Sequence, residues 1–334
     1  MKTEIQSQNF KDLLAGFTSD IKTLGMSYSA VTNYPLSLKE YFIYLEQNHN
    51  IKHISRVEEQ HSQAFKEHLQ QRTNLKTKNG GLSNQTINGT LKALNSFSRY
   101  ISNNSESFKY AITEDYLPVS IAEKIVLTQN EVMELYNATF ELYPHNPSSI
   151  EFGQRDRVII SLLYSVGLRK SEALKLDVSD IDFTNKRLLV RNGKRNKQRY
   201  VPIPNQSLED IRAYIQQSRY YFTERHHCSY YRYKSIKKKN YRPDENALLL
   251  SVQGTRINSF VQRLDYLKSK TTIQKNLTPH ILRHSLGTHL YQNGLDLDKI
   301  RIILGHASID TTQIYVHISE QLKNSNNSNE TDNL

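Results

Sequence analysis

The chain has 334 residues, of which 37% are hydrophobic and 10% aromatic, a composition that argues against global disorder and for two domains of ordinary size. Lysine and arginine outnumber aspartate and glutamate by 44 to 33, and this excess of +11 favours a polyanionic partner, of which nucleic acid is the usual one. A single cysteine excludes an intramolecular disulfide framework.

The N-terminal segment predicts neither export nor membrane insertion. Charged residues interrupt its first 17 positions, so it lacks the apolar core of a signal peptide. The longest apolar run, residues 158–168, contains serines and is too short to span a bilayer. We therefore expect a cytoplasmic protein without membrane association.

Four helices are predicted over the first 105 residues. Apolar residues recur there at helical spacing, Ser27 or Ser29 is positioned to cap the second helix, and Ser83 is positioned to cap the fourth. Pro35 either lies in the first turn of the second helix or kinks it. The predicted helices lie near Phe10–Ile21, Tyr34–Leu45, Glu58–Arg72 and Thr86–Ile101.

A change in composition predicts the domain boundary. Residues 102–126 combine a turn-like NNSES segment with Pro118, and segments of this kind typically join domains. Thr128 then caps a new helix, with Glu131 at capping-box spacing. We expect a helical domain over residues 1–110, a linker over 111–126, a second domain over 127–318, and a tail of disordered composition over 319–334.

The second domain is predicted to be mostly helical with a small antiparallel sheet. Alternating apolar residues between Val178 and Pro204, around the turn Asn192-Gly193, indicate a short strand and a hairpin. The other periodic segments predict helices near Gln154–Val166, Asn205–Tyr221, Ile257–Lys268, Pro279–Asn293, Leu297–Leu304 and Ile309–His317.

A helix start that suits phosphate binding is predicted at Thr278. This residue caps the helix, and Pro279 occupies its first position. His280 and Arg283 then lie three residues apart on one face, near the free backbone N–H groups and the positive dipole end that attract a phosphate. The leucines at positions 282, 286 and 290 form a different face, which suits the core.

The segment LGHASIDTTQIYVHI carries an imidazole and a phenol. Gly305 is predicted to end one helix, His306 follows it, and Ser308 caps the next helix, on which Tyr315 lies two turns along. We expect this exposed turn and helix to bring His306 and Tyr315 to the same cleft.

These motifs, together with an arginine in GLRKSEALKL and a lysine in NGKRNKQRYVPI, resemble the tyrosine recombinase family, also called phage integrases, which includes the Xer recombinases. The family pattern is an arginine in a GLR-x-S-E box, a lysine in a β-hairpin, His-x-x-Arg, and Leu-Gly-His with a tyrosine nine residues after that histidine. The resemblance is strong over residues 127–318, whereas residues 1–110 are similar to the core-binding domain only in pattern. The matching residues are Arg169, its supporting acid Glu172, Lys194, His280, Arg283, His306 and Tyr315.

The resemblance implies a site-specific recombinase that cleaves and rejoins DNA through a 3′-phosphotyrosyl intermediate on Tyr315, without cofactor, metal or ATP. It implies a helical core-binding domain followed by a mixed α/β catalytic domain. The implied partner is duplex DNA with inverted-repeat sites, and the protein is implied to be a monomer when free and a homotetramer on synapsed DNA. Residues 318–322 predict a helix with too little apolar surface to fold alone, and we expect it to dock on a neighbouring protomer.

The residue types fit this chemistry. Two arginines can bind the non-bridging oxygens of a phosphodiester and stabilise the added charge of its pentacovalent transition state. Lys194 is expected to protonate the departing 5′ oxygen, while His280 and His306 hydrogen-bond phosphate oxygens or assist the phenol proton. The motifs lack the neighbouring carboxylate cluster that a metal-dependent nuclease needs.

Each of these residues also has a structural explanation when taken alone. Arg169 could serve only in an ion pair, Lys194 could belong to a solvated charge run, and a lone tyrosine usually belongs to core or surface. His280 and His284 have a zinc-like spacing, but Ile281 occupies the position of the metalloprotease glutamate. The joint order and spacing favour a recombinase over a type IB topoisomerase-like enzyme or a non-catalytic DNA-binding regulator.

Further basic residues are predicted to contact DNA. One group lies in the hairpin, and another lies in an apparent insertion over residues 219–242, where basic residues and tyrosines mix in a way that suits phosphate contact and base stacking. The alternative for the insertion is a solvated loop. The predicted contacts are Arg195, Lys197, Arg199, Lys237, Lys238 and Lys239.

Overall fold

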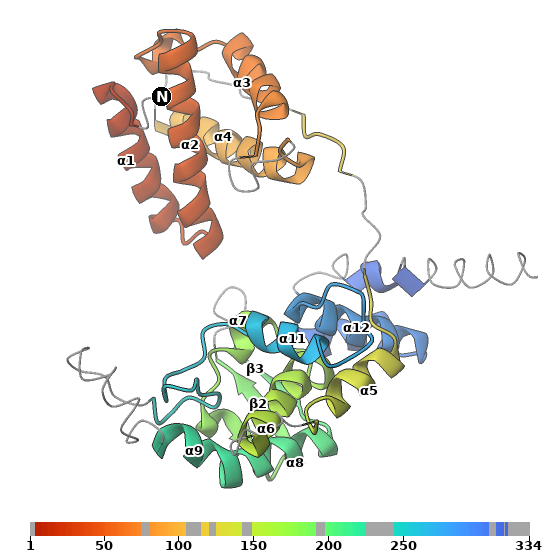
Figure 1. The fold of residues 1–334 in the computed structure, drawn as a ribbon. Helices are drawn as coiled ribbons and strands as arrows, with labels where there is room; N and C mark the ends of the chain where they lie inside the picture. The colour runs from red at the N-terminus through yellow and green to blue at the C-terminus, as the bar shows by residue number, and fades with distance from the viewer. Residues whose placement is uncertain are drawn as a thin grey trace, which may run out of the picture. The chain divides into compact units, whose positions relative to one another are not determined.

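The computed structural model describes residues 4–74, 81–104, 115–119, 125–141, 149–191, 198–224, 244–306, 312–316 and 318–319. The chain divides into two compact units, Met1–Ala122 and Glu123–Leu334, and each is described by itself (Figure 1). Within these ranges no helix combines the length and the apolar character needed to cross a membrane.

The described residues of the first unit form four α-helices, as the apolar spacing predicts. Ser27 rather than Ser29 caps the second helix, and the Ser83 hydroxyl accepts a hydrogen bond from the N–H of Thr86 at 3.2 Å at the start of the fourth. Pro35 lies inside the second helix, beyond its first turn. The helices are α1 (Gln8–Thr23), α2 (Tyr28–Asn48), α3 (Glu59–Gln71) and α4 (Asn84–Asn104), and a short 3₁₀ segment, η1 (Ile54–Arg56), precedes α3.

Aromatic side chains fill the core of the first unit. Phe10 of α1 stacks on Phe42 of α2 with 4.3 Å between the ring centroids, and Phe97 of α4 meets Phe42 edge-on at 5.4 Å. Phe17 also meets Phe97 edge-on, at 5.6 Å. All four rings are fully buried, and such pairs contribute about 0.5–1.5 kcal/mol each beyond the burial of area. One aromatic cluster therefore joins three of the helices.

The second unit combines helices with a small sheet (Figure 1). Its first helix begins at the predicted capping box, in which Thr128 and Glu131 satisfy each other's backbone N–H groups. At two places an α-helix continues directly into a π-helical segment. In chain order the elements around the sheet are α5 (Gln129–Asn137), α6 (Ser149–Ile160), η2 (Ser161–Ser165), α7 (Lys170–Ala173), η3 (Val178–Asp180), α8 (Asn205–Ala213), η5 (Tyr214–Ser218), α9 (Arg219–Glu224), α11 (Val261–Lys268), α12 (Pro279–Gln292) and α13 (Leu297–Leu304).

Three antiparallel strands form the sheet in the order β1-β2-β3. Leu188 of the middle strand pairs with Val201, and the last pair of the hairpin is Val190 with Arg199. The predicted turn at residues 192–193 lies outside the described residues. The expectation of a mostly helical fold with a small antiparallel sheet is confirmed. The strands are β1 (Ile181–Asp182), β2 (Arg187–Val190) and β3 (Arg199–Pro202).

The core of the second unit positions the helix ends that carry the predicted site. Leu162 and Leu163 of η2 are fully buried, and the chain leaves η2 directly for Gly167 and the start of α7. The segment η2 also packs against α12. The short helix α7 is therefore held close to α12 by the apolar core rather than by its own four residues.

Replacing Phe42 by alanine is expected to lower the free energy of unfolding by about 3–5 kcal/mol, because the change removes a fully buried ring and leaves a cavity. The matched control is Leu36→Ala on the same helix. Leu36 is 62% exposed, so its loss is expected to change stability by less than about 0.5 kcal/mol. Urea unfolding followed by far-UV circular dichroism measures both, and equal effects would contradict the aromatic core.

Candidate active site

A buried carboxylate lies at the centre of the site. Glu172 of α7 accepts hydrogen bonds from the guanidinium group of Arg169 at 2.8 Å and from the backbone N–H of Arg169 at 2.9 Å. Arg199 of β3 donates to both Glu172 oxygens, at 2.9 and 3.0 Å. The Glu172 side chain is only 3% exposed, so these donors replace the water that a carboxylate otherwise requires.

The pKa of Glu172 reflects this arrangement. Burial alone would raise the pKa of the carboxyl group, but hydrogen bonds from Arg199 and from the backbone N–H of Arg169, with the charges of both guanidinium groups, lower it to about 2. Glu172 is therefore ionised at neutral pH and provides a fixed negative charge under the arginines.

Arg283 of α12 supplies a third guanidinium group. It is almost fully buried and donates hydrogen bonds to the backbone carbonyl oxygens of Gly167 and Leu304. Its Nη1 lies 3.9 Å from Oε2 of Glu172. Burial and the charge of Arg169 lower the pKa of Arg283 to about 10, although Glu172 opposes the shift. Arg283 stays cationic at neutral pH, so three arginines face one carboxylate and the group carries net positive charge.

Two glycines with positive φ bring backbone carbonyls to the arginines. Gly167 (φ 71°) precedes Arg169, and Gly305 (φ 63°) ends α13 in the left-handed conformation, as predicted. The carbonyl of Gly305 accepts a hydrogen bond from Arg169 at 2.7 Å. A Cβ at Gly305 would lie 2.5 Å from Nε of Arg199, so a side chain there would strain the turn and displace an arginine.

Tyr315 is buried, and the prediction that it lies on an exposed helix is wrong. Its side chain has no accessible surface and lies against Gly287 of α12, where an added Cβ would be 2.3 Å from Cζ of the ring. The missing side chain at Gly287 leaves a slot that the phenol fills. The Tyr315 hydroxyl has no hydrogen-bond partner among the residues that the structure describes.

Two imidazoles flank Tyr315. The ring centroid of His306 lies 6.1 Å from that of Tyr315 with the planes nearly parallel, and the centroid of His284 lies 6.0 Å away. Nδ1 of His306 is 3.0 Å from the hydroxyl oxygen of Thr312, which fixes the direction of the ring. The structure thus brings His306 and Tyr315 together and adds His284 to the pair.

Burial and positive charge decide where the protons of this pair reside. Burial raises the pKa of Tyr315 to about 12, although Arg283 and Arg169 lower it. Burial, Arg283 and Arg169 together lower the pKa of His306 to about 3. At neutral pH the phenol keeps its proton and His306 is neutral, so one imidazole nitrogen can accept a hydrogen bond.

His280 differs from the buried residues of the site. It is exposed in the first turn of α12, which begins as predicted with a hydrogen bond from the N–H of Ile281 to the Thr278 hydroxyl at 3.2 Å. Its ring centroid lies 6.5 Å from that of His284. The remaining predicted site residues lie outside the described residues; they are Lys194, Arg195, Lys197, Lys237, Lys238 and Lys239.

The chain just past Tyr315 packs on its own unit. Ile318 is 2% exposed and belongs to the apolar cluster that contains Tyr315, Leu304 and Val126. The expectation that this residue docks on a neighbouring protomer is therefore wrong for Ile318, because its side chain finds apolar contacts within the chain. Residues 320–334 of the expected tail lie outside the described residues.

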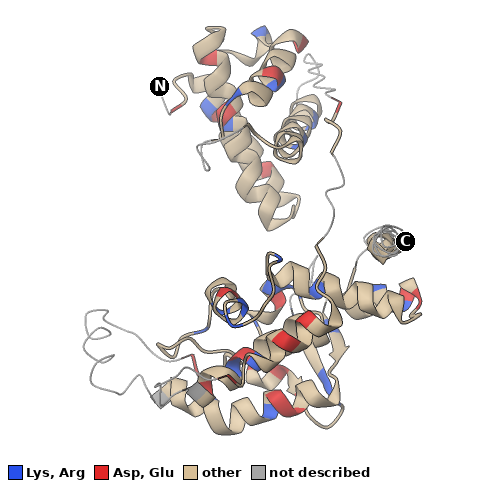
Figure 2. Ribbon diagram, turned by 45° about the vertical axis from the view of Figure 1, so that its right-hand side comes forward, with Lys and Arg blue, Asp and Glu red and all other residues tan. Residues whose placement is uncertain are grey.

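The site suits an anion rather than a cation. Acidic and basic residues occur together in both units (Figure 2), whereas Glu172 is the only acidic partner of Arg169, Arg199 and Arg283 among the residues that the structure describes. In the described part of the chain, no three histidine, cysteine, aspartate or glutamate side chains are grouped so that they could hold a metal ion.

Sequence reasoning missed the place of three residues in the site. It predicts Arg199 as a DNA contact, whereas the guanidinium group lies on Glu172 with the side chain 20% exposed. It considers His284 only as a zinc ligand, and it does not single out Gly287. A glycine inside a helical pattern is a signal for close packing, and this signal could have identified Gly287.

Three guanidinium groups on one carboxylate, beside an imidazole and a phenol, define a site that suits a phosphate group. Residues 126–321 match the phage integrase family. The tyrosine recombinase XerA of Thermococcus onnurineus (strain NA1) is 32% identical over 254 residues, which cover 73% of this chain and 74% of that protein. The tyrosine recombinase XerC of Lacticaseibacillus casei (strain BL23) is 29% identical over 306 residues, with 89% and 91% covered.

Solved structures of recombinases share the fold. The XerH site-specific recombinase bound to palindromic difH substrate has a TM-score of 0.66 at 19% identity, over 98% of this chain and 90% of that chain. A λ integrase (75–356) dimer bound to a COC′ core site has a TM-score of 0.59 at 14% identity, over 90% and 95%.

The chain belongs to the phage integrase family and is a site-specific tyrosine recombinase, a DNA strand-transferring enzyme. These similarities favour recombination over a type IB topoisomerase-like activity and over a non-catalytic regulator.

Glu172→Gln is expected to remove a pH-dependent contribution to stability. The folded pKa of about 2 lies below the ordinary 4.5, so ionised Glu172 stabilises the fold above pH 4.5, by an amount on the order of 3 kcal/mol. That stabilisation is lost as the pH falls toward 2. Urea unfolding of both proteins across this range should show their difference shrinking. Glu209→Gln, whose side chain is 63% exposed, is the control, and a difference that did not depend on pH would contradict the assignment.

Gly287→Ala is expected to lower stability by about 1–3 kcal/mol through overpacking, because the new methyl group would lie 2.3 Å from the Tyr315 ring. The control is Gly89→Ala on α4, where nothing lies within 4 Å of the new Cβ and a gain of about 0.4–1 kcal/mol is expected. Thermal melting measures both changes. A Gly287→Ala protein as stable as the parent would show that the ring does not occupy this slot.

Proposed function

We propose that this recombinase cleaves DNA by attack of the Tyr315 phenol oxygen on a backbone phosphorus, with Arg169 and Arg283 binding the phosphate. One observation carries the proposal. Arg283 donates a hydrogen bond to the carbonyl of Leu304, and Arg169 donates one to the carbonyl of the next residue, Gly305. His306 follows Gly305 directly, and its ring stacks beside that of Tyr315. A phosphate bound between these arginines therefore lies close to both the imidazole and the phenol.

The proposed step balances atoms and charge. The bond from the Tyr315 oxygen to phosphorus forms and the bond from phosphorus to the 5′ oxygen breaks, which leaves a 3′-phosphotyrosyl link and a free 5′ hydroxyl. Lys194 supplies the proton that the 5′ oxygen takes up, and His306 or His280 accepts the phenol proton or holds a phosphate oxygen. The reverse attack by a 5′ hydroxyl rejoins the strand and regenerates the phenol, so the exchange requires no ATP.

The arginines take the part that metal ions play in many nucleases. Arg169 and Arg283 stabilise the charge that the phosphate gains in the pentacovalent transition state. Glu172 fixes Arg169 and remains ionised, because its pKa is about 2. We therefore propose that cleavage requires neither a metal ion nor a cofactor.

Tyr315 must leave its slot before it can react. Its ring is fully buried, so the surrounding side chains cover it from a nearby phosphate, and its pKa of about 12 keeps the phenol protonated in this position. We propose that bound DNA draws the helical segment at residues 312–316 outward. The phenol then meets Arg169 and Arg283 directly, and their charge favours loss of its proton.

The proposed substrate is duplex DNA with inverted-repeat sites. The net charge of +11 supports such a partner, and the XerH structure was obtained on a palindromic substrate. We propose that residues 1–110 form the core-type DNA-binding domain, that residues 111–126 link it to the catalytic domain at 127–318, and that basic residues contact phosphates. The proposed contacts are Arg195, Lys197, Lys237, Lys238 and Lys239.

Exchange between two duplexes requires four cleavages, which is the reason for the assembly that we propose. The protein is a monomer in free solution and a homotetramer on synapsed DNA, and it acts in the cytoplasm. The Ile318 side chain is buried in an apolar cluster of its own unit. We therefore propose that residues 320–334 of the tail make the contacts between protomers.

Tyr315→Phe is expected to bind its recombination site normally and to form no covalent adduct on a nicked suicide substrate, because only the attacking oxygen is lost. Tyr291→Phe, which changes a phenol packed on the same apolar cluster, is the control and should keep the adduct. Denaturing electrophoresis detects the protein–DNA band, which should persist in excess EDTA. A covalent band with Tyr315→Phe would show that another residue is the nucleophile. Cleavage that stops in EDTA and returns only with magnesium would favour a metal-dependent nuclease.

A further inference from the structure

The stretch of chain just before α5 is held in place by side chains. The Lys275 amine donates a hydrogen bond to the backbone carbonyl of Val126 at 3.0 Å, and the Ser285 hydroxyl accepts one from the N–H of Leu127 at 2.9 Å. The imidazole of His289, which lies on the same face of α12 as Ser285, also hydrogen-bonds the backbone of Leu127. Side chains from α12 and from the segment before it therefore fix the path of these two residues.

The two side chains of this stretch enter different apolar clusters. Leu127 is fully buried in the main core of the second unit. Val126 is 6% exposed and belongs to the smaller cluster that contains Tyr315 and residues of α12 and α13. Val126 therefore helps to enclose the phenol ring, while Leu127 anchors the chain beside it.

Val126 has little support from regular secondary structure. Leu286 and Leu304 of the same cluster lie on α12 and α13, whose backbone hydrogen bonds hold them independently of the phenol. Val126 lies outside any helix or strand, and its carbonyl is bound by a lysine whose side chain is 37% exposed. Because segments with few backbone hydrogen bonds open first, we expect Val126 to be displaced before the helices are.

We propose that Val126, held by Lys275, is an autoinhibitory contact: it keeps the Tyr315 ring in the slot at Gly287 and must be displaced before the phenol can move toward a phosphate. The inference rests on the proposed function, in which Tyr315 is the nucleophile and leaves its slot. Burial of the ring against Gly287 favours the closed position, and the hydrogen bond from the charged amine adds to that preference. The contact thus sets the fraction of protein in which the phenol is free to react.

The test uses full-length Lys275→Met, which keeps the alkyl chain but removes the amine that binds the Val126 carbonyl. A hydrogen bond from a charged donor is worth a factor of about 10 or more in an equilibrium, so amide hydrogen exchange at residues 312–316 of the DNA-free protein is expected to become about 10-fold faster. Adduct formation on saturating nicked suicide substrate should rise by a similar factor, because cleavage follows opening. Lys275→Arg keeps a donor and should stay close to the parent.

Val126→Ala is the second variant. It removes two methyl groups from the cluster but keeps the backbone hydrogen bonds and the charge of Lys275. It should also accelerate both exchange and adduct formation. Agreement between the two variants would separate the loss of this contact from the loss of a positive charge near DNA.

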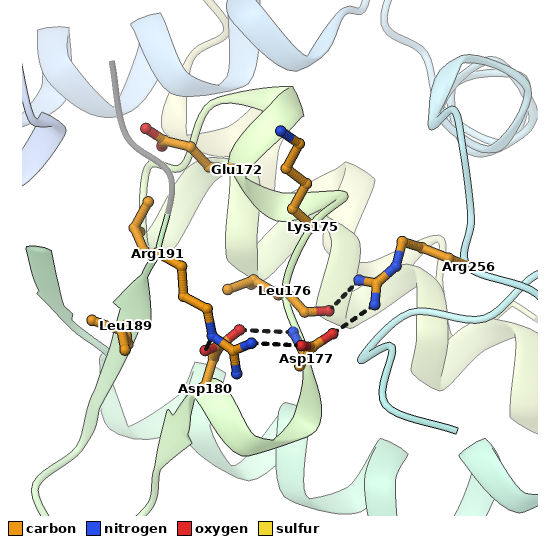
Figure 3. A pocket seen from close by; sticks show the side chains of 9 residues that line it. Glu172, Lys175, Leu176, Asp177, Asp180, Leu189, Arg191 and Arg256 are labelled. Atoms are coloured by element: carbon orange, nitrogen blue, oxygen red, sulfur yellow. Dashed lines mark hydrogen bonds and ion pairs between the residues drawn. The ribbon is translucent and has the colours of Figure 1, made fainter. Parts of the chain in front are cut away.

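Two controls detect a general loosening of the second unit. Thr272→Val removes the hydroxyl that donates to Glu134 of α5 at 3.1 Å. Arg256→Gln removes the guanidinium group that donates to Asp177 at 2.6 Å, in a charged network that lines a cavity elsewhere in the unit (Figure 3). Both variants should leave exchange at residues 312–316 unchanged.

The outcomes separate the inference from the proposed function. Parental exchange at residues 312–316 in both Lys275→Met and Val126→Ala would overturn the inference, as would an equal acceleration in the two controls. Faster exchange with slower adduct formation would also contradict it, since the contact would then assist the reaction. The exchange measurement needs no DNA and does not depend on which residue is the nucleophile. An adduct that persists with Tyr315→Phe would instead overturn the proposed function.

Discussion

The ionised carboxylate of Glu172 is the constraint on which the site depends. A buried carboxylate is tolerated only where donors replace its lost hydration, and here Arg169 and Arg199 provide them from two different elements. Arg283 lies a little farther away, at 3.9 Å, and is only partly neutralised. One negative charge thus holds more positive charge than it can cancel, and the excess is available to a phosphate.

Backbone carbonyls also help to hold two of these arginines in place. Arg283 and Arg169 together bind the carbonyls of Gly167, Leu304 and Gly305, which end two chain segments far apart in sequence. Because both glycines adopt positive φ, the chain can turn sharply enough to point these oxygens at the arginines. The anion site therefore requires that these two distant segments of the second unit be packed together.

The Tyr315 side chain belongs to an apolar cluster that also includes residues from distant parts of the chain. Tyr315 packs with Ile318 near the chain end and with Val126, the last residue of the expected linker. The backbone N–H of the next residue, Leu127, donates a hydrogen bond to the Ser285 hydroxyl on α12 at 2.9 Å. Ser285 lies two residues before Gly287, against which the Tyr315 ring packs. These contacts connect Val126 and Ile318 to the helix against which the Tyr315 ring packs.

The sequence by itself determined the local features, because these depend on near neighbours along the chain. Thr128 caps α5, Thr278 caps α12 and Gly305 ends α13 as their spacing predicts, and the Arg169–Glu172 pair follows from a separation of three residues at a helix start. The family pattern added the order of the reactive groups, which composition and periodicity alone do not contain.

Only the tertiary structure decided how those groups meet. Arg199 binds Glu172 rather than pointing freely from the hairpin, and Tyr315 lies in a slot made by Gly287 rather than on an exposed helix. Ile318 is likewise buried by its own unit. Each of these depends on contacts between segments distant in sequence, and helical or strand periodicity specifies which face of an element is apolar, not which neighbour covers it.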